Sequence, residues 1–157
     1  MVAPELRFEI DDLYSDYVAC LDDGELERWP ELFTDPCVYK IIPRENYERG
    51  LPLALMLCES RGMLQDRVAA LRHTSVFAPR ALRHLVSAIR VKREEPDVLH
   101  VEANYLVVQT LTDEETRVFN AGKYVDTLVR DGGRLKFRAK LCVCDSVLVP
   151  GSLVYPI

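Results

Sequence analysis

The beginning of the chain carries apolar residues at the spacing of an α-helix. The positions i, i+3, i+4, i+7, i+8 and i+11 are occupied by Ile10, Leu13, Tyr14, Tyr17, Val18 and Leu21. Acidic residues lie off this stripe, and Gly24 follows it, which is typical of a helix C-terminus. A second short helix is predicted over residues 25–33, with Leu26, Trp29 and Phe33 facing inward, before the dipeptide Asp35-Pro36 breaks it.

The middle of the chain changes its pattern twice. Residues 37–42 are rich in β-branched and aromatic types and predict a short strand, which Pro43 ends. Residues 43–52 contain two prolines, a glycine and several charges, so they predict a loop. Residues 53–72 predict a helix with a break near Gly62, and its clearest apolar stripe is Leu64, Val68 and Leu71.

From His84 onward the pattern predicts extended segments over residues 84–94, 97–111, 116–130 and 134–148. The connections between them hold turn-forming residues such as Asp131-Gly132-Gly133. Such short connections require antiparallel neighbours, because a parallel pairing needs a long crossover. In the last segment, simple alternation places Leu135, Phe137, Ala139, Leu141 and Val143 on one face, and Lys136, Arg138 and Lys140 on the other.

Helices followed by a run of strands indicate an α+β fold, with the N-terminal helices packed on one face of an antiparallel sheet. The length of 157 residues fits a single domain that spans residues 1–157. By analogy at the level of the fold, a strongly curved sheet wrapped around the first helix makes a cone with an interior pocket. This is the cone-shaped nuclear-transport-factor-2-like (NTF2-like) fold.

Charge and composition narrow the class of function. A net charge of −5 at pH 7 argues against nucleic acids and anionic membranes as partners. The chain has no run of about 20 apolar residues that would predict a membrane-spanning helix. Its first residues lack the basic patch and apolar run of a secretory signal. The five cysteines are odd in number and scattered, which favours reduced thiols and a cytoplasmic location.

Most signatures of catalytic chemistry are absent from the sequence. There is no glycine-rich phosphate-binding loop, no Gly-x-Ser-x-Gly turn, and no Cys-x-His with Cys-x-x-His set for a Rieske iron–sulfur cluster. An iron site with two histidines and one carboxylate would have to use His73 and His84. The simpler interpretation is that His73 caps a helix C-terminus and that His84 is hydrogen-bonded at a strand edge.

A proton-transfer site stays open as an alternative, since it needs only a cavity and one acid–base pair. The candidate acids are Asp22, Asp23 and Asp35, and the candidate partners are His73, His84, Tyr39 and Tyr105. The competing interpretation is that these acids are solvated caps and turn residues. A free-standing dehydratase or isomerase with a His–Asp dyad in the cone is thus one possible function, and a small-ligand-binding module is another.

Arginines crowd the middle of this acidic chain, at positions 61, 67, 72, 80, 83, 90 and 93. Arginine forms bidentate pairs with carboxylates and is enriched at protein interfaces. The interleaved apolar residues, without a pattern of stacking aromatics, argue against a nucleic-acid groove. A solvated helix face and an interface with a protein partner both fit this arrangement.

Six segments, taken in order, are similar to those of a known family. They are Trp29-Pro30-Glu31-Leu32-Phe33-Thr34-Asp35, Val38-Tyr39-Lys40-Ile41, Asp66-Arg67-Val68-Ala69-Ala70-Leu71-Arg72, Arg83-His84-Leu85-Val86, Ala121-Gly122-Lys123-Tyr124-Val125-Asp126 and Leu141-Cys142-Val143-Cys144-Asp145-Ser146. Over about residues 8–148, the chain resembles the small (β) subunit of Rieske non-haem iron aromatic-ring-hydroxylating dioxygenases. Details such as Trp-Pro-x-x-Phe-Thr are most similar to the terephthalate dioxygenase branch, with salicylate 5-hydroxylases as second neighbours.

Two features depart from the family pattern. Lys140 stands where an arginine is expected in the final strand, and lysine cannot form the bidentate pair of an arginine, so an ion pair there is in doubt. Residues 76–83 lack the tryptophan that is common in biphenyl- or naphthalene-type relatives. This absence argues against the hydrocarbon-oxidising branch of the family.

The resemblance implies a hexamer of three large α and three small β subunits (α3β3), with contacts between β subunits as well. The α subunit would carry the Rieske [2Fe–2S] cluster and mononuclear Fe(II), and a reductase would supply electrons from NADH to hydroxylate an aromatic acid, such as terephthalate, with O2. This chain would be structural and would hold no catalytic, cofactor-binding or metal-binding residue. The candidate contacts with neighbouring subunits are Arg67, Arg72, Arg83 and His84.

Overall fold

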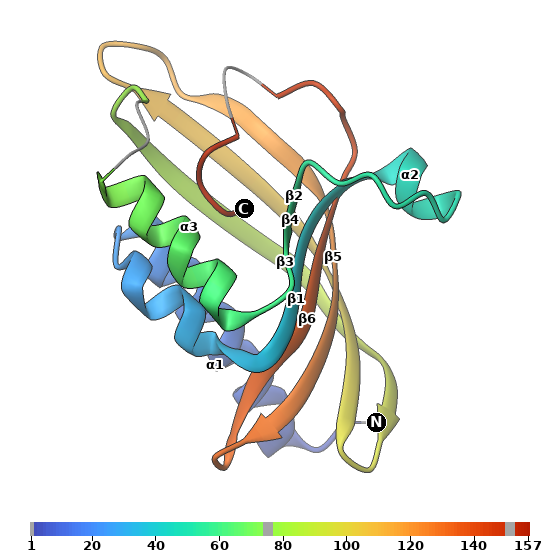
Figure 1. Cartoon of the computed structure of the whole chain (residues 1–157). Helices are drawn as coiled ribbons and strands as arrows, with labels where there is room; N and C mark the ends of the chain where they lie inside the picture. The colour runs from blue at the N-terminus through green and yellow to red at the C-terminus, as the bar shows by residue number, and fades with distance from the viewer. Residues whose placement is uncertain (1, 74–76, 150–152) are drawn as a thin grey trace.

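The computed structural model describes residues 2–73, 77–149 and 153–157 (Figure 1). Residue 76, where the tryptophan-free stretch begins, lies outside these ranges. The elements follow in the order α1 (Pro4–Asp22), the 3-10 helix η1 (Leu26–Leu32), β1 (Phe33–Pro43), α2 (Arg44–Glu48), β2 (Met56–Cys58), α3 (Arg61–His73), β3 (Arg80–Glu95), β4 (Val98–Leu111), β5 (Arg117–Asp131) and β6 (Arg134–Cys144).

The strands form one six-stranded sheet in the order β2-β1-β6-β5-β4-β3. The last four strands make the antiparallel meander that their short connections predict. β1 joins this meander in parallel to β6, and β2 pairs antiparallel with β1. The sheet is therefore mixed: the predicted antiparallel pairing is confirmed for the last four strands, and the parallel pairing of β1 departs from the predicted antiparallel sheet. A parallel neighbour is possible here because β1 and β6 lie at opposite ends of a long connection.

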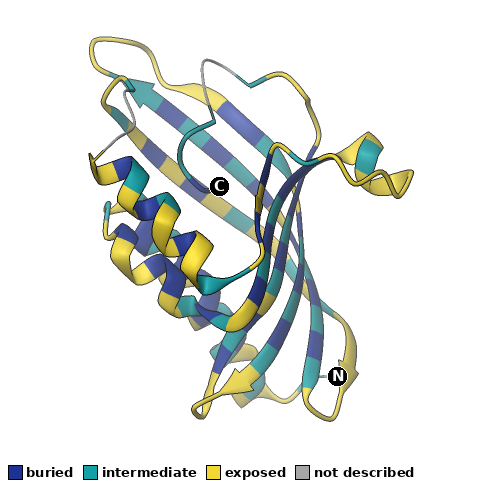
Figure 2. Ribbon diagram, viewed as in Figure 1, coloured by how far each residue is buried: buried dark blue, intermediate teal, exposed yellow. Residues whose placement is uncertain are grey.

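The helices and the sheet form two layers around one core (Figures 1 and 2). α1, η1 and α3 lie against one face of the curved sheet, whereas α2 projects from its edge. The stripe predicted for the first helix is buried at Ile10, Leu13, Tyr14, Tyr17 and Leu21. These observations confirm the α+β arrangement with helices on one face. Within the described ranges, no helix is both long enough and apolar enough to cross a lipid bilayer.

Two predictions for the middle of the chain are corrected. The helix predicted over residues 53–72 begins only at Arg61, because residues 56–58 pair with the free edge of β1, with Cys58 opposite Tyr39. In this short strand Met56 and Cys58 face inward and Leu57 faces outward, which is the period of a strand and not of a helix. The predicted loop also contains a short helix, α2.

The prediction for the final strand is wrong in its second half. β6 ends at Cys144, and a register shift lies where Leu128 pairs with Phe137 and Thr127 pairs with Ala139. Arg138 is the extra residue of this bulge, so the alternation changes phase after it. The inward residues are then Lys140, Cys142 and Cys144, with buried Val143 beside them. β3 also begins four residues before His84, at Arg80.

Candidate functional site

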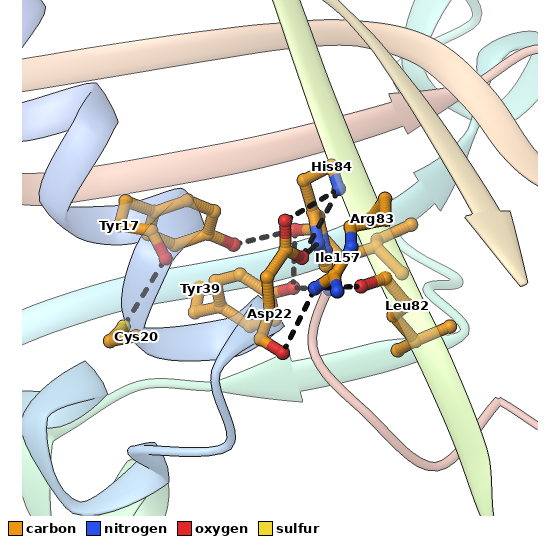
Figure 3. A network of polar contacts seen from close by, with 8 residues as sticks. All are labelled: Tyr17, Cys20, Asp22, Tyr39, Leu82, Arg83, His84 and Ile157. Atoms are coloured by element: carbon orange, nitrogen blue, oxygen red, sulfur yellow. Dashed lines mark hydrogen bonds and ion pairs between the residues drawn. The ribbon is translucent and has the colours of Figure 1, made fainter.

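Asp22 and His84 form the one pair that the structure assembles from the predicted acid–base candidates (Figure 3). Asp22 ends α1, and His84 lies on the inward face of β3. The Nδ1 atom of His84 is 2.6 Å from Asp22 Oδ1, and the His84 backbone N–H donates to both carboxylate oxygens at 3.1 Å. The His84 side chain is completely buried, and its Nε2 atom has no hydrogen-bond partner in the described part of the chain. The pair therefore fastens the end of α1 to β3.

The other candidates for this dyad lie elsewhere. Asp23, Asp35 and His73 are exposed. The Tyr105 hydroxyl donates to Asn120 at 2.6 Å, and the Tyr39 hydroxyl contacts Ile157. An open groove of about 570 Å³ between α1 and β3 runs past Asp22 and His84. Because the free Nε2 atom of His84 has almost no accessible surface, a substrate in this groove would not reach it.

Lys140 and Asp126 form a second buried pair, which the sequence did not predict. Lys140 Nζ donates to Asp126 Oδ2 at 2.9 Å, the Tyr14 hydroxyl donates to the same oxygen, and both charged side chains are fully buried. The Lys140 ammonium also lies 3.5 Å from the ring centroid of Tyr124 and 4.4 Å from that of Tyr17. Burial raises the pKa of Asp126, and the Lys140 ammonium and the Tyr14 hydrogen bond oppose this rise.

The ion pair that the Lys140 departure placed in doubt is therefore present, with lysine as its cation. The sequence contains one weak sign of this ion pair, which is the position of Asp126. Asp126 falls between Tyr124 and Leu128, two residues from each, on the buried face of β5. An acid at such a position requires a buried partner, and the bulge in β6 supplies it.

The predicted interface arginines differ in how far their own chain engages them. Arg72 is held: it pairs with Glu27 through two contacts of 2.8 and 3.0 Å and donates to the Gly24 carbonyl at 2.6 Å. Arg67 lies beside the Cys58 thiol. Arg83 is exposed, and its hydrogen bonds to the described residues are long, at 3.5 Å to the Asp22 and Leu82 carbonyls. Arg83 is thus the most available of the three for another subunit.

The Arg72–Glu27 pair should give the stability a small dependence on acid. The hydrogen bond from Arg72 lowers the pKa of Glu27 to about 2. An acid with a lowered folded pKa stabilises the fold above its unfolded pKa of about 4.3, and this contribution is lost as the pH falls toward 2. We expect Arg72→Gln to lower the melting temperature by about 2 °C or less at pH 7, with the difference shrinking below pH 4. Thermal scans across this pH range test the expectation. As a control, the double variant Arg72→Gln/Glu27→Gln should have the same melting temperature as Arg72→Gln alone.

Exposed apolar side chains recur along residues 47–63, from α2 through β2 to the first turn of α3, and we call this set the leucine face. Its members are Tyr47, Leu51, Leu53, Leu55, Leu57 and Met63. Leu53 is the most exposed of them, at 74%. The segment includes the edge strand β2 and follows the projecting α2 (Figure 2). Large apolar patches on a protein surface mark contacts with a partner.

The described residues offer no group of three or more His, Cys, Asp or Glu side chains that could hold a metal ion. All five cysteines are free and buried, as expected for reduced thiols. Burial raises the pKa of the Cys142 and Cys20 thiols to about 12, so both stay protonated at neutral pH. These thiols are therefore packing groups and hydrogen-bond donors rather than nucleophiles.

Comparison with known proteins assigns this chain to one family. The family model described as "Ring hydroxylating beta subunit" matches residues 18–150. The chain belongs to this family. It is 41% identical to the anthranilate 1,2-dioxygenase small subunit of Burkholderia cepacia, over 96% of this chain and 93% of that protein. A solved structure from Novosphingobium aromaticivorans DSM 12444, assigned as the β subunit of an aromatic-ring-hydroxylating dioxygenase, is 43% identical, with a TM-score of 0.91 and complete coverage of both chains.

The predicted family and the predicted NTF2-like fold are both confirmed by these comparisons. The chain is a β subunit of an aromatic-ring-hydroxylating dioxygenase complex, and this membership implies an α subunit as partner. The predicted terephthalate branch is not confirmed. Identity to a terephthalate 1,2-dioxygenase β subunit of Comamonas sp is only 26%, over 90% of this chain and 92% of that protein.

Proposed function

We propose that this β subunit is the structural, non-catalytic small subunit of an oxygenase that hydroxylates an aromatic acid. An anthranilate-like acid is favoured over terephthalate by the higher identity to the anthranilate relative, 41% against 26%. One observation supports the structural role: the two buried ionic pairs of the described chain join its own side chains to one another. Asp22 binds His84, and Lys140 binds Asp126. Neither pair offers a reactive atom to a substrate.

The alternative of a free-standing dehydratase or isomerase has one observation in its favour, the 2.6 Å contact between His84 and Asp22. A general base must reach the proton that it abstracts, either directly or through one water. The free nitrogen of His84 is buried, so this geometry supports a fastening role for the pair better than catalysis.

In the proposed complex the chemistry comes from the large subunit. That subunit would carry a Rieske [2Fe–2S] cluster and mononuclear Fe(II), and a reductase would pass electrons to it from NADH. The proposed assembly is an α3β3 hexamer in the cytoplasm, with β subunits in contact with one another. Support comes from the family membership.

The leucine face, together with Arg67 and Arg83, is the surface that we assign to contacts with neighbouring subunits. Apolar side chains supply most of the association free energy at an obligate interface, and arginines are enriched there. His84 would contribute indirectly, because its side chain is buried and can only hold Asp22 and β3 in place. Arg72 would mainly brace α3 against η1.

Co-expression with the large subunit tests this assignment. Tagged α subunit should retain wild-type β subunit during affinity and size-exclusion chromatography. The double variant Leu53→Asp/Leu57→Asp and the variant Arg83→Glu should each reduce the retained β subunit at least about tenfold, because a charge at a buried contact costs several kcal/mol.

Phe8→Asp is the matched control, since Phe8 is an apolar residue with an exposure (69%) close to that of Leu53 (74%), and it lies outside the leucine face, on α1. It should leave the retention unchanged. Circular dichroism of each free β variant shows that the fold is intact. Wild-type retention of both the leucine-face and the Arg83 variants would reject this surface. If the α subunit alone hydroxylated an aromatic acid at the rate of the complex, the activity would not need the β subunit. This result would contradict the proposed structural role.

A further inference from the structure

In the described part of the chain, the curved sheet has one face that no helix covers, and we call it the open sheet face. α1, η1 and α3 lie against the opposite face, and α2 projects from the edge (Figure 1). A sheet face turned to water usually carries polar side chains. Here many outward positions, which alternate with the buried ones, hold apolar residues. Half-buried examples are Val38 on β1, Leu106 on β4, Val125 on β5 and Leu141 on β6.

The strand register sets these apolar side chains beside cationic ones. Directly paired residues of neighbouring strands lie on the same face of a sheet. In the next row, Lys123 lies opposite Val143. The open sheet face is therefore an apolar band bordered by positive charges. One row of paired positions crosses the whole sheet, in the order Leu57, Lys40, Leu141, Val125, Glu102 and Arg90.

The open sheet face has more cations than its own acid can pair. Lys92 and Lys123 share Glu102, with distances from Nζ to Oε2 of 3.8 and 3.5 Å. The side chains of Lys40 and Arg90 form no ion pair or hydrogen bond with the described residues. This face therefore offers unpaired positive charge beside apolar surface.

The helical layer on the other side of the sheet is acidic. From α1 through η1, residues 4–32 contain ten aspartates and glutamates but only two arginines, whereas the rest of the chain has more basic than acidic residues. Glu9, Asp12 and Asp16 follow the helical spacing i, i+3 and i+7, so they form a stripe along α1. Together with Glu31 of η1, they line an open groove of about 740 Å³.

Part of this negative charge is unpaired. Asp12 and Glu31 form no ion pair or hydrogen bond with the described residues. Lys136 in the same groove pairs with Asp131 at 3.1 Å, and Arg134 at the start of β6 is the groove's unpaired cation among the described residues. The two sides of the molecule therefore carry unpaired charges of opposite sign.

We propose that the open sheet face binds the acidic helical layer of a second copy of this chain, so that β subunits associate head to tail. The inference rests on the proposed function, because it assigns surfaces to the contact between β subunits. The two surfaces lie on different sides of the sheet, so the contact does not use the same patch on both partners. Each copy keeps one surface for the next copy, as in cyclic assemblies.

Charge selects this arrangement over a symmetric one. Two open sheet faces placed against each other would bring Lys40, Arg90 and Lys123 of both copies together, and two helical layers would oppose acid to acid. Like charges that face one another across an interface are strongly unfavourable. Only the contact of sheet with helices pairs opposite charges, and it also removes the apolar band around Val125 and Leu141 from water.

Light scattering of the free β subunit tests whether the contact forms. At about 50 mM salt, the average mass should rise above that of one chain as the protein concentration increases to about 200 μM. Raising the salt to about 500 mM should lower the mass, because salt screens exposed charges. The mass of a single chain at every concentration and at both salt levels would overturn the proposal.

Two variants alter the two surfaces separately. The sheet variant is Lys40→Glu/Lys123→Glu, and the helix variant is Asp12→Asn/Asp16→Asn/Glu31→Gln. Each should weaken self-association about tenfold or more, because one of the two surfaces no longer attracts the other. Self-association of both variants at the wild-type level would reject these surfaces.

The control for the sheet variant is Arg49→Glu/Arg117→Glu, which changes the net charge by the same amount. Both arginines are exposed and lie outside the two surfaces, since Arg49 follows α2 and Arg117 begins β5. This control should associate like wild type. An equal loss in the control and in the sheet variant would show that net charge alone governs association, which contradicts the proposal. Circular dichroism confirms that each variant is folded.

Mixing the sheet variant with the helix variant tests the head-to-tail geometry directly. The intact helical layer of the first can bind the intact sheet face of the second, whereas every other pairing lacks a native surface. We therefore expect a heterodimer with one copy of each variant that does not grow further. Absence of this heterodimer, or assemblies as large as those of wild type, would reject the head-to-tail contact.

The retention assay with tagged α subunit distinguishes this inference from the proposed function, because neither variant alters the leucine face or Arg83. If the leucine-face variant loses the α subunit while the sheet and helix variants self-associate like wild type, only the head-to-tail contact fails. If the sheet and helix variants lose self-association while the leucine-face and Arg83 variants keep wild-type retention, the surface assigned under the proposed function fails and the head-to-tail contact is supported.

Discussion

Replacing Lys140 by methionine is expected to lower the free energy of unfolding by about 3–5 kcal/mol. The substitution keeps the approximate shape of the side chain but leaves the Asp126 carboxylate buried without its cation, with only the Tyr14 hydroxyl as partner. The energy of such a pair is dominated by the cost of an uncompensated buried charge and not by the attraction of the pair itself. Urea titration at pH 7 with constant slope measures the effect.

The pH dependence of this variant identifies the mechanism. Without the Lys140 ammonium, burial holds the folded pKa of Asp126 above its unfolded pKa. An acid of this kind destabilises the fold fully above its folded pKa, and the penalty falls below that pKa until it vanishes at the unfolded pKa of about 3.9. The deficit of Lys140→Met should therefore shrink as the pH is lowered from 8 toward 4. A deficit that does not change over this range would mean that lost packing, not the charge of Asp126, is the cause.

Lys136→Met is the matched control on the same strand. Lys136 pairs with Asp131 at 3.1 Å, but this pair lies at the surface, and its loss should cost less than about 1 kcal/mol. The double variant Asp126→Leu/Lys140→Met should recover most of the lost stability, because it removes both buried charges. If the double variant were no more stable than Lys140→Met, the unpaired charge of Asp126 would not be the cause of the lost stability.

Replacing Gly122 by alanine is expected to cost about 3 kcal/mol or more. Gly122 lies on β5 opposite Cys144 of β6 and Tyr105 of β4. A Cβ atom at this position would lie 2.0 Å from the Val143 carbonyl oxygen and 2.9 Å from the Cys144 Cα atom. Both atoms belong to the backbone, so no side-chain rotation relieves the clash and the two strands must separate locally. Thermal and urea unfolding of the free β subunit measure the loss.

Gly62→Ala provides the comparison at a glycine without this constraint. Gly62 lies in α3, and a Cβ atom there would meet only the Ser60 hydroxyl, at 3.7 Å. Alanine has the higher helix propensity, so this variant should be unchanged or up to about 1 kcal/mol more stable. If Gly122→Ala were tolerated as well as Gly62→Ala, the close approach of β5 and β6 would not be a feature of the folded protein.

The predictions from sequence held where a long segment has a single period. The stripe from Ile10 to Leu21 spans several helical turns, and its buried face follows directly from the repeat. The meander of β3 to β6 was predictable because its short turns leave only antiparallel neighbours. The short strand β2 was missed, because three residues are too few to show a period and the free edge of β1 decides their conformation.

The site was predictable only in part, for a related reason. Candidate pairs between aspartate and histidine could be named from residue types, but only the crossing of α1 over β3 selects Asp22 and His84 among them. Lys140 was noted as unusual, yet simple alternation placed it outside. A one-residue bulge at Arg138 reverses the faces of everything after it, and nothing in the local composition marks that position.

By itself, the sequence determined the α+β class, the apolar face of the first helix, the order of the last strands and the family, because each depends on local repeats or on motifs in a fixed order. Tertiary structure alone decided the parallel pairing of β1 with β6, the burial of Lys140 beside Asp126 and the burial of Ile157 against the hydroxyls of Tyr17 and Tyr39. These features join residues far apart in the chain. Their free energy comes from burial and hydrogen bonds that exist only when the whole fold closes, so no local pattern carries them.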